Sequence, residues 1–154
     1  MITFTRITGT ILALSLVWFA PPGRAADLPG FDIAQYRGKV VLLDFWASWC
    51  APCLESFPWM QSVHERYASR GLVVVAVNVD HERDAADRFL RARNASFAVV
   101  FDREGALAER FHVASMPQSF YIDRAGTVRY VHNGFHGRDR VDAERELLAL
   151  VNEP

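Results

Sequence analysis

The chain has 154 residues, of which 51% are hydrophobic, and its formal net charge is −1. This length and composition predict one domain with a hydrophobic core of its own. A net charge near zero, with no long basic or acidic run, argues against a nucleic-acid partner and against a disordered charged tail.

Residues 1–25 predict a signal peptide. Arg6 precedes an apolar run over residues 7–20, which is shorter than the roughly 20 residues that a membrane span needs. Small residues favour cleavage after Ala25. Cleavage leaves residues 26–154 as one domain that is soluble in the periplasm or otherwise outside the cytoplasm. In the alternative, the uncleaved segment tethers the domain to the inner membrane.

The rest of the chain alternates between strand and helix patterns. The strands are expected at residues 39–46, 72–79, 97–101, 118–123 and 127–132. The helices are expected at residues 50–69, 83–93, 104–111 and 138–152, the last with Val141, Leu147, Leu148 and Val151 on one face. This order predicts an α/β fold with a central mixed sheet flanked by helices, in which parallel crossovers precede an antiparallel hairpin.

Cys50 and Cys53 are the only cysteines, and they lie between an expected strand and an expected helix. Thiols at this spacing can close a small ring, and a helix N-terminus favours the thiolate of the first one. A bridge this short restrains the unfolded chain little, so an exported pair indicates a redox centre rather than a structural disulfide. A zinc site would need two further ligands, and no second cysteine pair exists.

The residues around this pair carry a family resemblance. Residues 44–53, Asp-Phe-Trp-Ala-Ser-Trp-Cys-Ala-Pro-Cys, resemble the active-site segment of thioredoxins, and Met116-Pro117 resembles their cis-proline loop. Residues 80–111 resemble the insertion of TlpA/ResA-like extracytoplasmic thioredoxins, and residues 122–126 resemble their hairpin turn. The resemblance covers residues 38–151 and implies a thioredoxin fold with a TlpA-like insertion before the cis-proline.

The chain also departs from the TlpA-like pattern. Its N-terminal hairpin is shorter than is usual in that group. Many of those relatives have asparagine where this chain has Asp44, and glutamate where it has Ser56. Thioredoxin's lysine beside the buried carboxylate is replaced by Ala76. The proton-handling carboxylate is therefore expected where cytosolic thioredoxins have it.

The resemblance implies the chemistry of the pair. Cys50 attacks a disulfide of the partner to form a mixed disulfide, and Cys53 resolves it. Asp44 lies in an apolar strand, where burial raises the pKa of a carboxyl group. It is therefore expected to accept the proton of Cys53.

Four residues are expected to contact the substrate. Trp49 covers the rim of the site, and Pro52 withdraws one N–H donor from the thiolate. A cis bond before Pro117, which the resemblance implies, exposes the backbone of Met116 to pairing with a substrate strand. An Ala-Pro pair without a cation stabilises the thiolate weakly, which favours a reducing role.

The sequence therefore predicts a monomeric thiol–disulfide oxidoreductase that reduces protein disulfides, similar to proteins that keep apocytochrome or copper-site cysteines reduced. It requires no cofactor and no metal, but it needs an upstream electron donor such as a membrane thiol reductase. Two alternatives stay open: a thiol oxidase or isomerase of the same fold, and a Cu(I) metallochaperone that binds copper through Cys50 and Cys53.

Overall fold

The computed structural model describes residues 31–154, so the expected signal peptide over residues 1–25 lies outside the described residues. The strands are β1 (Val40–Trp46), β2 (Leu72–Asn78), β3 (Ala98–Phe101), β4 (Gln118–Ile122) and β5 (Val128–Asn133). The α-helices are α1 (Cys53–Tyr67), α2 (Arg83–Arg93), α3 (Ala106–Arg110) and α4 (Arg140–Asn152). Three short 3₁₀ helices are η1 (Ile33–Tyr36), η2 (Ala68–Arg70) and η3 (Gly137–Asp139). Between residues 31 and 154, no helix is both long and apolar enough to cross a membrane.

The strands form one mixed sheet in the order β3-β2-β1-β4-β5. β1 pairs in parallel with β2, which pairs in parallel with β3, whereas β4 and β5 are antiparallel. β1 is therefore the central strand, and all seven of its residues are buried. Its nearly continuous apolar sequence is typical of a strand covered on both faces. The expected mixed sheet with a closing hairpin is confirmed.

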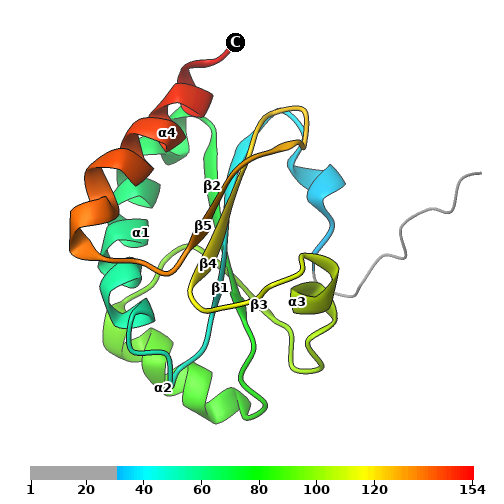
Figure 1. Cartoon of the computed structure of the whole chain (residues 1–154), viewed down its shortest axis with the longest axis vertical. Helices are drawn as coiled ribbons and strands as arrows, with labels where there is room; N and C mark the ends of the chain where they lie inside the picture. The colour runs from blue at the N-terminus through cyan, green and yellow to red at the C-terminus, as the bar shows by residue number, and fades with distance from the viewer. Residues whose placement is uncertain (1–30) are drawn as a thin grey trace, which may run out of the picture.

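Helices cover both faces of the sheet (Figure 1). One face carries α1, α2 and α4, which pack on a cluster that includes Leu42 and Trp46 of β1. The other face carries η1 and α3, which pack on Val41, Leu43 and Phe45. Because side chains alternate along a strand, β1 contributes to both clusters.

The last helix corrects one sequence expectation. Val141, expected on the apolar face of residues 138–152, is 74% exposed. The buried residues of α4 are Ala143, Leu147, Leu150 and Val151. These positions follow the helical repeat of i, i+4, i+7 and i+8, whereas residue 141 points away from that stripe.

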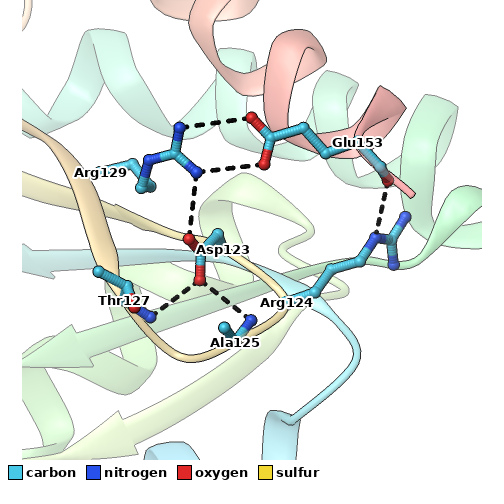
Figure 2. A network of polar contacts seen from close by, with 6 residues as sticks. All are labelled: Asp123, Arg124, Ala125, Thr127, Arg129 and Glu153. Carbon is cyan, nitrogen blue, oxygen red and sulfur yellow. Dashed lines mark hydrogen bonds and ion pairs between the residues drawn. The ribbon is translucent and has the colours of Figure 1, made fainter.

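Arg124, in the turn between β4 and β5, joins three segments at the end of the sheet opposite Cys50. Its guanidinium donates hydrogen bonds to the backbone carbonyls of Gly38, Arg70, Val151 and Glu153. Figure 2 shows its bond to the Glu153 carbonyl beside Arg129, which pairs with the Glu153 and Asp123 carboxylates. This contact fixes the C-terminus of α4 against the start of β1.

Candidate active site

Cys50 and Cys53 form a disulfide just after β1, with their Cα atoms 5.4 Å apart. α1 begins at Cys53, not at Cys50 as the sequence suggested, because residues 50–52 form a turn ahead of the helix. The backbone N–H of Cys53 donates to Cys50 Sγ over 3.3 Å. In the reduced protein, an N–H donor at this place stabilises the Cys50 thiolate.

Both cysteines of the disulfide are buried. Cys50 is only 4% exposed, and Cys53 is 0% exposed. Both belong to the core cluster on the α1 face, against which the half-buried Met116 packs. Trp49, in contrast, is 69% exposed. Cys50 therefore offers little surface to solvent, although the residue before it exposes a large aromatic ring.

The loop that enters the cysteine pair is held by Asp80, which follows β2. Both carboxylate oxygens of Asp80 accept from the Ser48 N–H, at 2.9 and 3.2 Å, and Oδ1 also accepts from the Ser48 hydroxyl. Asn78 Nδ2 donates to Asp80 Oδ2 over 2.8 Å, which orients the carboxylate. These contacts of Asp80 were not predicted from the sequence. The feature that could have indicated them is an aspartate at the carboxyl end of a buried parallel strand, where functional side chains gather.

Asp44 is fully buried in β1. Its Oδ1 accepts a hydrogen bond of 2.5 Å from the Ser119 hydroxyl, and its Oδ2 has no hydrogen-bond partner among the described residues. Burial raises the pKa of Asp44 to about 7, and the Ser119 hydrogen bond opposes part of this shift. Side chains alternate along β1, so Asp44 lies on the same face of the sheet as Trp46, which is the face that α1 covers. The group can exchange a proton near neutral pH.

Ala76 and Ser56 are two residues at which the chain departs from its relatives, and the structure shows their surroundings. Ala76 lies directly opposite Asp44 on β2, so no cation faces the carboxylate from that strand. Ser56 is buried in α1, and its hydroxyl donates to the Cys53 carbonyl, whereas Glu55 is exposed. Asp44 is therefore a buried carboxyl group without a cation opposite it on β2.

The loop before β4 contains a cis peptide bond between Met116 and Pro117. The Pro117 carbonyl accepts from the Gly134 N–H over 2.7 Å, and the Gln118 side chain accepts from the Ala114 N–H. These bonds tie the loop to the end of β5 and to itself. Met116 thereby packs on the cluster that contains both cysteines.

Pro52, in the turn between the cysteines, is exposed, as is its neighbour Ala51. Among residues 31–154, no group of three or more His, Cys, Asp or Glu side chains is arranged to hold a metal. The Nε2 atom of His132 lies 2.7 Å from a carboxylate oxygen of Glu146 in α4. A Cu(I) ion bound at the reduced cysteine pair would have Cys50 and Cys53 as its ligands.

The chain is similar to a known protein family and to its members. The model of the Redoxin family matches residues 19–147. The chain belongs to the Redoxin family. It is 32% identical to thiol-disulfide oxidoreductase ResA of Geobacillus kaustophilus over 133 residues, which cover 85% of this chain and 75% of that protein.

Solved structures agree with this assignment. A candidate thiol:disulfide interchange protein DsbE from Chlorobium tepidum is 43% identical and superposes with a TM-score of 0.78, covering 81% of this chain and 92% of that one. StoA from Bacillus subtilis is 28% identical with a TM-score of 0.60, covering 70% and 82%. The fold is thioredoxin-like, and this member of the Redoxin family is a ResA- and DsbE-like thiol–disulfide oxidoreductase.

Proposed function

We propose that this Redoxin-family protein reduces disulfides of partner proteins outside the cytoplasm. The observation that carries the proposal is the Cys50–Cys53 disulfide at the start of α1, with the Cys53 N–H directed at Cys50 Sγ. The same hydrogen bond is available to a thiolate, which is the nucleophilic form of cysteine.

The reaction begins with the reduced pair. The Cys50 thiolate attacks one sulfur of the partner's disulfide, and a mixed disulfide forms as the other partner sulfur leaves with its electron pair. Cys53 then attacks Cys50 Sγ, which closes the Cys50–Cys53 bond and releases the second partner thiolate. The partner gains two electrons and the cysteine pair loses two.

Asp44 serves as the base for the second step. It is buried on the face of the sheet that α1 covers, and its pKa of about 7 suits proton exchange with a thiol near neutral pH. The proton of Cys53 passes to this carboxylate before Cys53 attacks. Cys53 itself is 0% exposed, so solvent is a poor acceptor for that proton.

The partner docks around the exposed indole of Trp49. Pro52, exposed in the turn, and Met116 with the cis Pro117, on the adjacent loop, form the rest of the docking surface. An extended segment of the partner pairs with the backbone at Met116, as peptides pair with exposed strand edges. Residues 80–111, which precede this loop and add β3 to the sheet, are the TlpA-like insertion and contribute to partner choice.

The protein acts in the periplasm or an equivalent compartment. The apolar N-terminal stretch followed by a small-residue site supports export. A domain that reduces others must itself be reduced again, so a membrane thiol reductase is the electron donor. The protein acts as a monomer and requires no bound cofactor.

The direction of the reaction is tested by the reduction potential. A value near that of thioredoxin, about −270 mV, supports a reductant, whereas a value near that of the oxidant DsbA, about −120 mV, contradicts it. The potential is measured by equilibrating the protein with glutathione or dithiothreitol buffers.

Trapping identifies the partner and the attacking cysteine together. Cys53→Ser is expected to accumulate a mixed disulfide between Cys50 and its substrate, because the resolving thiol is missing. Cys50→Ser is the matched control and is expected to trap nothing. Trapping of equal amounts by both variants would contradict the proposed order of attack.

A further inference from the structure

A row of four residues crosses the sheet at the level of Asp44. In the pairing registers, Asp44 of β1 lies opposite Ala76 of β2 and Ser119 of β4, and Ser119 lies opposite His132 of β5. Ser119 is only 7% exposed, and its hydroxyl donates to Asp44 Oδ1. Ser119 is thus the polar group that approaches Asp44 from the neighbouring strand.

The two oxygens of Asp44 are not equivalent. Oδ1 is held by the Ser119 hydroxyl, while Oδ2 has no hydrogen-bond partner within residues 31–154 although it is buried. A buried carboxylate oxygen without a donor is costly, so it readily takes a proton. We infer that Ser119 is a positioning residue, which holds Oδ1 and leaves Oδ2 to receive the proton of Cys53. This inference rests on the proposed function.

The proton transfer balances as follows. The S–H bond of Cys53 breaks, and an O–H bond forms at Oδ2 of Asp44. The Cys53 thiolate then forms the bond to Cys50 Sγ, and the bond between Cys50 and the partner sulfur breaks. The electron pair leaves on the partner thiolate, which takes a proton from water, and Oδ2 later returns its proton to water.

The surroundings of Asp44 include few other titratable groups. β4 contributes Tyr121, whose pKa is raised mainly by burial and further by the negative charges of Asp44 and Glu146. Beyond it, the pair between His132 of β5 and Glu146 of α4 closes this side of the sheet. The residue opposite Asp44 on β2 is Ala76. Of the two cysteines, Cys53 is the first residue of α1 and Cys50 lies in the turn before it.

The hydroxyl of Ser119 stabilises the charged form of Asp44 and thereby lowers its pKa, against the larger effect of burial. A hydrogen bond to a charged group corresponds to about one to two pH units of pKa. Without the hydroxyl, Asp44 is expected to hold its proton to a higher pH. Less carboxylate is then available at neutral pH to accept the proton of Cys53.

The first experiment follows the ¹³C resonance of the Asp44 carboxyl in the oxidised protein as a function of pH. Its midpoint is expected to rise by about one pH unit in Ser119→Ala. Ser119→Thr keeps the hydroxyl and is expected to keep the midpoint. Ser119→Val has nearly the shape of the threonine variant but no hydroxyl, and it is expected to raise the midpoint. An unchanged midpoint in both Ser119→Ala and Ser119→Val overturns the inference.

A measurement on the unmodified protein covers the case in which the variants do not fold. The Ser119 hydroxyl proton is expected to exchange slowly with water above the midpoint of Asp44. Rapid exchange there overturns the inference.

The second experiment measures, by stopped flow, the pH dependence of mixed-disulfide resolution. Its midpoint is expected to move upward in Ser119→Ala by the shift seen in the titration, while the rate of first attack by Cys50 is unchanged. A uniform loss of rate at every pH would indicate a merely structural role and contradict the inference. The titration needs no activity, so it separates this inference from the proposed function: absence of reductase activity with a shifted titration contradicts only the function.

Discussion

Asp80 and Ser48 are joined by three hydrogen bonds, two from the Ser48 N–H and one from its hydroxyl. Ser48 lies two residues before Cys50, and Asp80 is only 7% exposed at the end of β2. The carboxylate thus anchors the active-site loop to the neighbouring parallel strand. The position of Cys50 therefore depends on a residue that is far from it in sequence.

Replacing Asp80 by alanine is expected to weaken this anchor. The Ser48 N–H loses its acceptor, and the free energy of unfolding is expected to fall by about 2 to 4 kcal/mol. Attack by reduced Cys50 on a model disulfide is expected to slow by about 10- to 100-fold because the sulfur is displaced. Urea denaturation and stopped-flow kinetics measure the two effects. Glu104→Ala, at an exposed acidic residue, is the control, and an equal effect of both variants would contradict the anchoring role.

Asp44→Asn is expected to change how stability depends on pH. The pKa of Asp44 is about 7 in the folded protein and about 3.9 in the unfolded chain, so the folded protein binds more protons between these values. Stability is therefore full below about pH 4 and falls as pH rises towards 7, by about 4 kcal/mol in total. The asparagine variant lacks this loss. Its stability relative to the wild type is therefore expected to rise by about 4 kcal/mol as the pH rises over this range.

The comparison uses urea denaturation of both proteins at about pH 4 and about pH 8. Contributions from all other groups are common to the two proteins and cancel. Asparagine keeps an oxygen that accepts from Ser119, so the exchange removes the charge with little change of shape. Equal stability differences at both pH values would show that Asp44 ionises normally.

Arg124 and Arg129 offer a matched pair of arginines in one hairpin (Figure 2). Arg124 binds four backbone carbonyls, whereas Arg129 pairs with the exposed carboxylate of Glu153 and with Asp123. Arg124→Ala is expected to cost about 2 to 3 kcal/mol of unfolding free energy. Arg129→Ala is expected to cost less than about 1 kcal/mol, as for surface ion pairs. Denaturant unfolding of both variants measures the two losses. A larger loss in Arg129→Ala than in Arg124→Ala would refute the central role of Arg124.

The buried face of α4 is tested by Leu147 and Val141. Leu147 is 0% exposed and Val141 is 74% exposed. Leu147→Ala is expected to destabilise the protein by about 2 to 5 kcal/mol through the cavity it leaves. Val141→Ala is expected to change stability by less than about 0.5 kcal/mol. Thermal unfolding of both variants provides the measurement. Comparable losses of stability in the two variants would contradict this assignment of the buried face of α4.

Local patterns were sufficient for much of the fold. The pattern of residues 39–46 predicted the strand β1 to within one residue, and the pattern of residues 83–93 predicted α2 with its observed bounds. Cys50 and Cys53 are close in sequence, so their pairing required no long-range information. These features depend on neighbouring residues, whose periodicity is visible in the chain itself.

The polar contacts that surround the cysteine pair depend instead on residues far apart in the sequence. Asp44 meets Ser119, and Ser48 meets Asp80, because β4 and β2 pair with β1 in one particular register. A shift of one residue would turn these side chains to the opposite face of the sheet. The sequence alone therefore determined the redox pair and the order of strands and helices. Only the tertiary structure decided which polar side chains surround the pair, because register and burial are set by packing between strands far apart in the chain.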